Sequence, residues 1–382
     1  MKKYIFIILF FAAFVQQIFS QQFKVATLNC EWLSCDDMGP SDEPLQLNNI
    51  AQVIININAD IVALQEVGTS ASYKTVDLLV NRLNQLGNGW AGAIAPSSNS
   101  NCAQNQAIIY KTSKVQSISY LLMSNGGSAV NWNYNWSSGR FPALYEVNFL
   151  TNDGAVPVSV INIHAKASTG YSDHLEDYAR RKAASEGLKA LLDGNNYKNK
   201  RIILIGDYND YLIGTQCGEC STNNSPYKNF MDDTPNYKGL TQNVNNGRLI
   251  DNMVISNELF DNYVANSAAR ITATGVSNYQ STTSDHYPII ALLQFGNYSA
   301  VDEIEAAPEI SIYPNPTADE LVISGQWSVL SDVQIFDITG KLIYNLQFTI
   351  YNSINVSALS QGIYLLRINT DKGIFTKKFI KM

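Results

Sequence analysis

The stretch that decides the fold is RIILIGDYND, residues 201–210. Four consecutive large apolar residues, from Ile202 to Ile205, are typical of a short buried strand. Gly206 interrupts this strand, and Asp207 and Asn209 follow at its end. Buried strands that end in polar side chains often present those groups to a ligand. Because Gly-Asp and Asn-Asp also form ordinary turns, the stretch has to be read together with the rest of the chain.

Strand-like and helix-like segments surround this stretch. Apolar residues at helical spacing predict helices at 47–57, 76–86 and 174–192. The buried face predicted for the third helix contains Leu175, Tyr178, Ala179, Ala183, Leu188, Leu191 and Leu192. Predicted strands cover 23–29, 60–64, 107–110, 115–122, 143–150, 156–163, 201–205, 249–255 and 287–295. Strands outnumber helices without strict alternation, which predicts an α+β fold with two sheets packed face to face and helices outside.

The two ends of the chain differ from its centre. Residues 1–20 combine two lysines, an apolar run and a small final residue, which predicts a secretory signal peptide. The rest of the sequence has no apolar run of about 18 residues, so we expect no transmembrane segment. Residues 297–309 contain few large apolar residues and predict a linker. Short strands separated by turns predict a small all-β sandwich at 310–382.

The protein is acidic, with a formal net charge of -7. Residues 22–296 carry 18 lysines and arginines against 24 acidic residues, a difference of -6. Proteins that hold nucleic acid by unselective attraction to phosphate are usually basic. Any contact with nucleic acid must therefore depend on local basic residues or a bound cation, and the acidic body favours a transient substrate.

The chain contains five cysteines, an odd number that leaves one thiol over when the others pair. An exported protein can form disulfides. Cys217 and Cys220 form a Cys-Gly-Glu-Cys sequence that fits a redox motif, half of a zinc site or a small disulfide loop. The absence of a second pair with zinc spacing favours the local disulfide. Cys30 and Cys35 are candidates for another bridge.

Acidic, amide and histidine side chains recur at the ends of the predicted strands. They are Asn29, Glu66, His164, Asp207, Asn209, Asp251, Asp285 and His286. Carboxylate and amide oxygens are suited to Mg²⁺, with Mn²⁺ or Ca²⁺ as alternatives. Two histidines beside such a cation suit phosphate chemistry, because one exchanges a proton with water while the other stabilises charge on phosphoryl oxygens. An aspartate commonly holds a catalytic histidine in the required tautomer.

Six motifs occur in the order found in the endonuclease/exonuclease/phosphatase family. They are TLNCEW (27–32), ALQEV (63–67), NIHAK (162–166), GDYND (206–210), LIDNMVIS (249–256) and SDHYP (284–288). Over residues 22–296 the chain thus resembles this family, which includes deoxyribonuclease I. The resemblance implies a four-layer α/β/β/α sandwich and a divalent-metal-dependent hydrolase of phosphoric esters.

The resemblance also implies a role for each candidate residue. Glu66 resembles the main metal ligand, supported by Asn29, with Asp285 beside the metal network. Asp207 and Asn209 resemble the pair that orients the attacking water and the scissile phosphate. The remaining assignments are His286 as catalytic histidine, Asp251 as the residue that holds it, His164 as second histidine and Arg140 as a phosphate contact.

Two positions depart from the family pattern. Tyr208 replaces the commoner phenylalanine. In addition, no convincing acid between residues 90 and 108 is available to pair with His164, as deoxyribonuclease I would have. His174, in Ser172-Asp173-His174, imitates the later Ser-Asp-His motif, but it begins a predicted helix that Asp173 would cap, so we expect a structural role.

The C-terminal unit has a resemblance of its own. SIYPNPTADEL (311–321), VQIFDITGKLI (333–343), LSQGIYLLRI (359–368) and KKFIKM (377–382) resemble the sorting domain of type IX secretion substrates. This resemblance implies that the type IX machinery is a partner and that the protein is released or attached at the outer surface.

Taken together, these patterns predict a secreted nuclease that acts on extracellular DNA or RNA. The alternatives are a sphingomyelinase-like phospholipid phosphodiesterase, a phosphomonoesterase or a non-catalytic surface binding protein. A phospholipid substrate would require an apolar membrane-touching hairpin, for which residues 130–137 are the candidate. The aromatic residues Trp132, Tyr134 and Trp136 in this segment fit base stacking, lipid contact or an ordinary exposed loop equally well.

Overall fold

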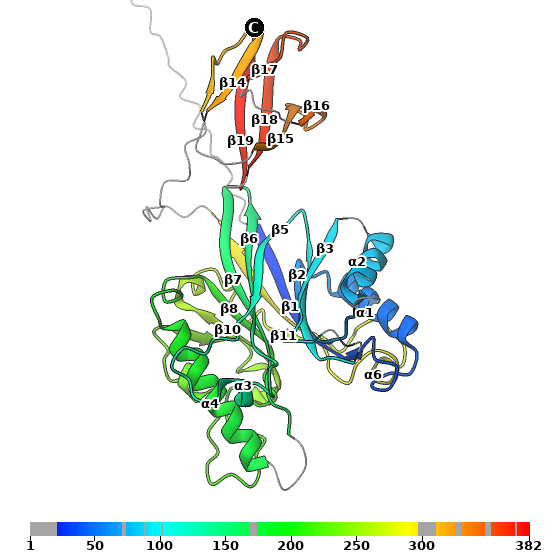
Figure 1. Cartoon of the computed structure of the whole chain (residues 1–382), viewed down its shortest axis with the longest axis vertical. Coiled ribbons are helices and arrows are strands. Elements are labelled where there is room, and N and C mark those ends of the chain that lie inside the picture. The colour runs from blue at the N-terminus through cyan, green and yellow to red at the C-terminus, as the bar shows by residue number, and fades with distance from the viewer. Residues whose placement is uncertain are drawn as a thin grey trace, which may run out of the picture. The chain divides into compact units, whose positions relative to one another are not determined.

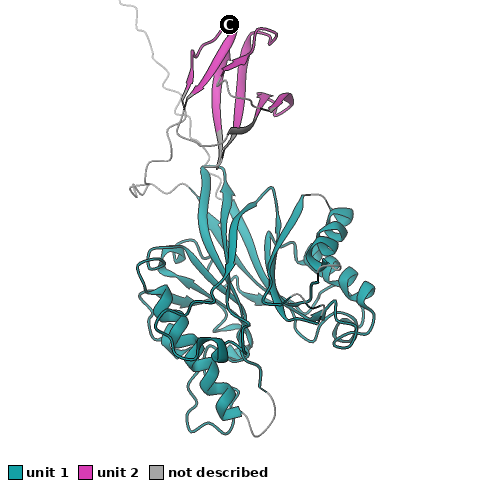
Figure 2. Ribbon diagram, in the orientation of Figure 1, with its two compact units in different colours: residues 1–297 teal, residues 298–382 magenta. Residues whose placement is uncertain are grey.

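The computed structural model of the chain describes residues 21–70, 74–87, 89–98, 100, 102–168, 174–296, 311–324, 330–347, 353–370 and 373–382. The predicted signal peptide and the predicted linker lie outside these ranges. The chain divides into two compact units, residues 1–297 and 298–382 (Figure 2). Within the described ranges, no helix has both the length and the apolar character needed to cross a membrane.

Two six-stranded sheets form the larger unit (Figure 1). The first has the order β11-β12-β1-β2-β4-β3, with β1 Gln21–Leu33, β2 Ile61–Val67, β3 Trp90–Ala95, β4 Asn105–Lys111, β11 Ala269–Arg270 and β12 Ile289–Phe295. The second has the order β5-β6-β7-β8-β10-β9, with β5 Val115–Leu122, β6 Ala143–Thr151, β7 Gly154–His164, β8 Ile202–Asp207, β9 Tyr237–Gly239 and β10 Asp251–Ser256. Edge strands β3, β9 and β11 were not predicted. Strands β9 and β11 have only three and two residues, and β3 (WAGAIA) consists mostly of small residues, so all three carry little periodic signal.

The sheets pack against each other through one buried apolar core. Phe23 of the first sheet stacks on Phe149 of the second, with ring centroids 4.7 Å apart, and Ile203 and Ile205 join them in the core. Helices α1 Glu43–Ile57 and α2 Thr75–Leu86 cover the first sheet, whereas α3 Trp132–Asn135 and α4 His174–Leu192 cover the second (Figure 1). The shorter helices are α5 Lys228–Met231, η1 Val244–Gly247, η2 Asn257–Leu259 and α6 Tyr279–Thr282. The predicted four-layer α/β/β/α sandwich is confirmed.

Helix α4 has the predicted bounds, and its predicted face is buried in part, at Tyr178, Leu188 and Leu192. Leu175 is 54% exposed, although it was expected inside. The helix instead buries Arg181, which forms an ion pair with Asp210 at 3.0 Å, and Asp177, which pairs with Lys166 at 2.8 Å. Apolar periodicity could not reveal this face, because a buried charge is tolerated only when a distant segment supplies its partner.

The disulfides agree with one expectation and contradict the other. Cys217 and Cys220 form the predicted local bridge. Cys35 pairs with Cys102 and not with Cys30, whose free thiol is buried between the first sheet and its helices. The bridge therefore ties the end of β1 to the loop that precedes β4.

In the aromatic segment at 130–137 both tryptophans are buried, although Val130 and Tyr134 are exposed. None of the three predicted roles, base stacking, lipid contact or an exposed loop, therefore fits the tryptophans. Trp132 and Trp136 are 6% and 1% exposed and pack in the core beneath α4. The Trp132 indole donates a hydrogen bond to the Met123 carbonyl at 2.8 Å. Tyr134 stays exposed, with the Arg180 guanidinium 4.0 Å from its ring centroid.

The smaller unit is all-β and antiparallel in every named strand pair, as predicted. One sheet contains β13 Ser311–Tyr313, β14 Glu320–Ser324 and β17 Ser353–Asn355. The other has the order β16-β15-β18-β19, with β15 Leu330–Asp337, β16 Leu342–Gln347, β18 Gly362–Thr370 and β19 Gly373–Lys381. Apolar residues from both sheets, among them Leu321, Ile335 and Phe379, form its core.

Candidate active site

Three of the predicted site residues lie side by side across the second sheet. His164 at the end of β7 is paired in register with Asp207 at the end of β8. Asp207 is in turn paired with Asp251, the first residue of β10. Because the three strands are adjacent, residues that are 43 and 44 positions apart in the sequence share one edge of the sheet.

The first sheet brings the other candidates to the same edge. Asn29 lies in β1, Glu66 lies in β2, and His286 precedes β12 by a few residues. The Asn29 amide nitrogen donates to Glu66 Oε1 at 3.1 Å and to Asp207 Oδ2 at 3.0 Å. The Asn29 oxygen accepts the Glu31 backbone N–H at 3.0 Å, which directs the amide nitrogen toward the two carboxylates. Asn29 therefore holds the two carboxylates together across the sheets.

His286 and Asp251 form a hydrogen-bonded dyad. His286 Nδ1 lies 2.8 Å from Asp251 Oδ2, and His286 Nε2 lies 4.0 Å from Asp207 Oδ2. Burial lowers the pKa of His286, but the charge and hydrogen bond of Asp251, together with the charges of Asp207 and Asp285, outweigh burial, so this pKa lies well above its usual value. Ser284 accepts the His286 backbone N–H and donates to the Asn29 carbonyl, which positions the histidine against β1.

Asp207 is the most constrained carboxylate of the site. Its Oδ1 accepts the Asn209 backbone N–H at 2.8 Å, and its Oδ2 accepts the side-chain amides of Asn29 and Asn209. Burial is the largest influence on Asp207 and raises its pKa, while the nearby His286 opposes that rise. Asn209 has a φ of 52° and also donates to the Ala165 carbonyl at 3.2 Å, so it links the ends of β7 and β8.

His164 is buried between two carboxylates. Its Nε2 is 3.5 Å from Glu66 Oε1 and 3.6 Å from Asp207 Oδ2. Its Nδ1 has no hydrogen-bond partner among the described residues, in agreement with the missing acid between residues 90 and 108. Burial, followed by the charges of Arg140 and His286, lowers the pKa of His164 well below its usual value.

Arg140 is half-buried beside His164 and contacts protein acceptors. Its Nε donates to the His164 carbonyl at 2.9 Å, and its Nη2 donates to the carbonyl of Ala165 at 2.5 Å and to Ser137 Oγ at 3.1 Å. Its Nη1 donates to Gln104 Oε1. These contacts hold the end of β7 in place, and a contact between Arg140 and phosphate stays a prediction.

Asp285 lies at the rim of the site. Its side chain is 64% exposed, and its Oδ1 is 3.8 Å from His286 Nε2. Its backbone N–H donates to Glu31 Oε2 at 2.9 Å. Burial raises the pKa of Glu31, and the charge of Asp285 raises it further. Sequence reasoning missed Glu31 as a site residue. Its place in the TLNCEW motif, two residues after Asn29, was a usable signal for it.

Gln46 is a positioning residue that sequence reasoning missed. From helix α1, its amide nitrogen donates to the carbonyls of Cys30, Glu31 and Thr283 at 2.7, 2.9 and 3.0 Å. These bonds join the TLNCEW segment to Thr283, the residue before the SDHYP segment. A glutamine on a predicted helix gives no sign of such contacts, since two of its acceptors lie in β1 and the third lies on a loop 237 residues away.

The donor set fits a hard divalent cation. Asp207, Asp251 and His286 offer ligand atoms within 4.8 Å of one another, and Glu66 adds a carboxylate through its contacts with Asn29 and His164. Asp251 Oδ1 is buried and has no partner among the described residues. Buried carboxylates at this density are commonly neutralised by a cation. The ligand roles of Glu66, Asn29 and Asp285 stay predictions.

Comparisons with known proteins place the chain in a family. Residues 26–286 match the model of the Endonuclease/Exonuclease/phosphatase family, and residues 311–382 match the Secretion system C-terminal sorting domain. No curated protein matches the chain. Similar solved structures include a conserved protein of unknown function from Enterococcus faecalis V583, with 16% identity, a TM-score of 0.48, and coverage of 72% of this chain and 100% of that chain.

Two further structures illustrate the range of this likeness. The catalytic domain of human Nocturnin with bound sulfate is 15% identical, with a TM-score of 0.48 and coverage of 72% of this chain and 94% of that chain. An endonuclease/exonuclease/phosphatase from Beutenbergia cavernae DSM 12333 is 16% identical, with a TM-score of 0.48 and coverage of 94% and 99%. From its motifs, its fold and the family match over most of its length, the chain belongs to the endonuclease/exonuclease/phosphatase family and carries a secretion-system sorting domain at its C-terminus.

Proposed function

We propose that this protein is a secreted, divalent-metal-dependent phosphodiesterase that cleaves extracellular DNA or RNA. The observation that carries the proposal is the convergence of the His286–Asp251 dyad with Asp207, Glu66 and His164 at one edge of both sheets. This combination of a carboxylate cluster and an oriented histidine suits hydrolysis of a phosphoric ester. A non-catalytic binding protein has no need of it.

In the proposed mechanism, water attacks phosphorus in line with the departing oxygen. Asp207 and His286 share the handling of protons at Asp207 Oδ2 and His286 Nε2, while Asp251 keeps the histidine ring oriented. Asn209 and His164 lie beside Asp207 and orient the phosphoryl oxygens, with Arg140 supporting that side of the site. A cation held at Glu66, most simply Mg²⁺ with Mn²⁺ or Ca²⁺ as alternatives, would withdraw charge from the phosphate.

Nucleic acid is favoured over a membrane lipid by the burial of two tryptophans. The segment at 130–137 is the candidate for membrane contact, but Trp132 and Trp136 pack in the core. A sphingomyelinase-like activity would have to reach its lipid without these side chains. The match to a sorting domain supports export, and we infer that the type IX machinery delivers the protein to the outer surface or the medium.

A substrate panel tests the function. The full chain is assayed with Mg²⁺, Mn²⁺ or Ca²⁺ against plasmid DNA, RNA, sphingomyelin and inositol phosphates. We expect cleavage of nucleic acid that EDTA abolishes and that His286→Ala lowers by at least about 10²-fold, the usual contribution of a general acid or base. Lys200→Gln is the matched control, because Lys200 precedes β8 at the opposite end from Asp207.

Each contrary outcome has a distinct meaning. If the protein turns over only sphingomyelin or only inositol phosphates, it is a phospholipid phosphodiesterase or a phosphomonoesterase and not a nuclease. Full activity of His286→Ala, or full activity in EDTA, would refute the mechanism. A folded protein that turns over none of the substrates would support the binding-protein alternative.

A further inference from the structure

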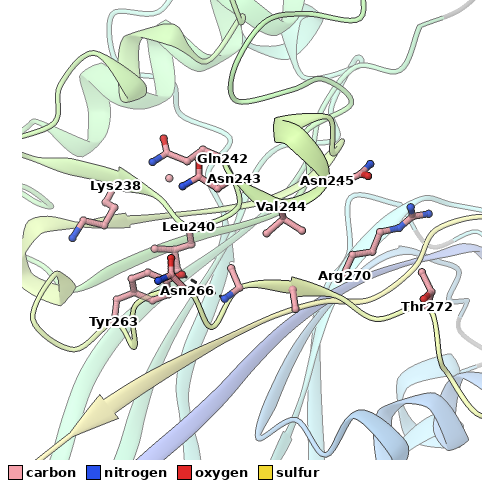
Figure 3. Close-up of a pocket in the computed structure, with 13 residues that line it drawn as sticks. Lys238, Leu240, Gln242, Asn243, Val244, Asn245, Tyr263, Asn266, Arg270 and Thr272 are labelled. Atoms are coloured by element: carbon pink, nitrogen blue, oxygen red, sulfur yellow. Dashed lines mark hydrogen bonds between the residues drawn. The ribbon is translucent and has the colours of Figure 1, made fainter.

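A cavity of about 630 Å³ lies beside the active edge and contains none of the catalytic residues. We call it the edge groove. One wall is the segment 238–245, which leads from β9 into η1, and the other is the segment 263–272, which contains β11 (Figure 3). The groove thus runs between an edge of the second sheet and an edge of the first. Its size is in the range of small-molecule sites and suits about one nucleotide rather than a duplex.

Each wall contacts the sequence neighbour of one member of the His286–Asp251 dyad. In the first wall, the Thr241 hydroxyl donates a hydrogen bond to Asn252 Oδ1 at 2.6 Å, and Asn252 is the neighbour of Asp251. In the second wall, Arg270 pairs with Ile289, and its guanidinium lies 4.7 Å from the ring centroid of Tyr287, the neighbour of His286. The walls of the edge groove are therefore fixed to the segments that carry the dyad.

The lining is polar and cationic in a protein that is acidic as a whole. Lys238 and Arg270 lie at opposite ends, with Leu240 and Val244 between them (Figure 3). Among the described lining residues there is no carboxylate, and neither cation forms an ion pair with a described residue. Four side-chain amides complete the polar lining, namely Gln242, Asn243, Asn245 and Asn266. Because the rest of the protein is acidic, an anion is attracted to the groove and repelled by most of the remaining surface.

These features match the chemistry of an unpaired nucleic acid strand. Cations spaced along a groove neutralise successive phosphates, and an aromatic ring such as Tyr263 can contact a base. Amides of asparagine and glutamine pair with base edges, because they offer both a donor and an acceptor. A phosphomonoester or a lipid headgroup would use one cation and leave the other end of the groove empty.

Resting on the proposed nuclease function, we propose that the edge groove binds unpaired nucleotides of the substrate beyond the scissile phosphate. Arg270, nearer the dyad, takes a phosphate close to the cleaved bond, and Lys238 takes one farther along the strand. The amides and Tyr263 contact the intervening base. The groove accordingly makes the enzyme prefer single strands several nucleotides long over dinucleotides.

The test separates binding in the groove from chemistry at the dyad. Labelled single-stranded oligonucleotides of 2 to about 12 nucleotides are titrated in EDTA by fluorescence anisotropy across a salt series, and the same oligonucleotides are cleaved with the active metal. The Arg270→Gln/Lys238→Gln double variant is compared with the wild type and with Lys200→Gln, which removes one charge at the far end of the sandwich. Bis(p-nitrophenyl) phosphate, which is too short to enter the groove, reports on the dyad alone.

We expect the double variant to bind the long oligonucleotide at least about tenfold more weakly, because two phosphate contacts are lost. The slope of log K against log salt should fall by about 1.4, or about 0.7 for each phosphate on a single strand. Its KM for the long oligonucleotide should rise while its rate on bis(p-nitrophenyl) phosphate stays unchanged. Asn243→Ala, which removes one exposed amide, should weaken binding without altering the salt slope.

The failures are distinguishable. If the wild type cleaves single strands but the double variant keeps the same affinity and salt slope, the edge groove is not a nucleotide site and the nuclease function stands. If the double variant loses activity on bis(p-nitrophenyl) phosphate as well, its effect passes through the dyad and the groove proposal is wrong. If the wild type neither binds nor cleaves nucleic acid, the nuclease function and the groove proposal both fall.

Discussion

His286 Nδ1 lies 2.8 Å from Asp251 Oδ2, and this contact joins the first sheet to the second at the active edge. Asp251 opens β10, whereas His286 lies in the segment that leads into β12. The same carboxylate has a second oxygen, Oδ1, that is buried without a partner among the described residues. Asp251 thus directs its charge toward the histidine and has no competing bond within the described structure.

Replacing this carboxylate should damage catalysis more than folding. We expect Asp251→Asn to lower kcat by about 10²–10⁴-fold, because the amide keeps the shape of the side chain but no longer stabilises a charged His286. Single-turnover cleavage of the preferred substrate measures the loss, and urea unfolding shows whether the fold is preserved. An Asp251→Asn enzyme within threefold of the wild-type kcat would show that the dyad is not part of the reaction.

Gly206 is required by the close approach of β7 and β8. Its φ is 136°, and a Cβ at this position would lie 2.1 Å from the Ile163 carbonyl oxygen. Gly154 has a similar φ of 130°, but a Cβ there would meet nothing within 4 Å. We expect Gly154→Ala to cost about 1–2 kcal/mol for conformation alone. Gly206→Ala should cost at least about 2 kcal/mol more, because it adds steric overlap.

Urea unfolding of the two alanine variants measures the difference directly. Since Gly206 is followed by Asp207, which pairs with His164, Gly206→Ala should also lower activity, whereas Gly154→Ala should not. Equal losses of stability in the two variants would contradict the steric argument.

The two disulfides should differ in their contribution to stability. Cys35 and Cys102 are 67 residues apart, and Cys217 and Cys220 are 3 apart. Loop-closure entropy predicts a loss of about 4 kcal/mol when the long-range bridge is removed and about 1.5 kcal/mol for the short one. The double serine variants, Cys35→Ser/Cys102→Ser and Cys217→Ser/Cys220→Ser, are compared by urea unfolding.

Peptide mapping without reduction provides the control for this comparison. It should recover the Cys35–Cys102 and Cys217–Cys220 peptides and leave Cys30 unmodified until the protein is unfolded, because its thiol is buried. A Cys30–Cys35 peptide would contradict the described pairing.

The buried ion pair between Arg181 and Asp210 should be important for stability. Both side chains are fully buried, and the Arg181 guanidinium also donates to the Lys166 carbonyl at 2.9 Å. We expect Arg181→Met to cost about 3–5 kcal/mol, since Asp210 would remain buried without its cation. Its neighbour Lys182 forms an exposed pair with Glu186, so Lys182→Met should cost no more than about 0.5 kcal/mol.

Chemical denaturation with matched buffers distinguishes the two outcomes. Because Asp210 ends the GDYND motif, Arg181→Met should also disturb Asp207 and Asn209 and reduce activity. An Arg181→Met protein as stable as Lys182→Met would mean that solvent or another residue compensates the Asp210 carboxylate.

Local patterns predicted most of the secondary structure, because apolar periodicity is a property of neighbouring residues. Helix α4 was predicted with its observed bounds, and every predicted strand of the larger unit overlaps an observed one. The buried face of α4 was predicted only in part: Tyr178, Leu188 and Leu192 are buried as expected. The burial of Arg181 and Asp177 was missed, since it depends on partners outside the helix. The same reason explains Trp132 and Trp136, whose burial depends on α4 packing over them.

The candidate site was predicted as a set of residues but not as a set of contacts. Polar residues at strand ends and six ordered motifs were sufficient to select Asn29, Glu66, Asp207 and His286. No local signal indicated that Gln46 would contact the loop before His286. Nor did any local signal indicate that Arg140 would donate hydrogen bonds to carbonyls at the end of β7. Such contacts depend on how the two sheets face each other.

The sequence by itself determined that strands would end in carboxylates, amides and histidines, because side-chain alternation and chain breaks are encoded locally. Only the tertiary structure decided which carboxylate meets which histidine, how Cys35 finds Cys102, and where a cationic groove opens between two sheet edges. The physical reason is that these contacts join segments far apart in the chain. Their geometry follows from the packing of two twisted sheets around one core, which no single segment contains.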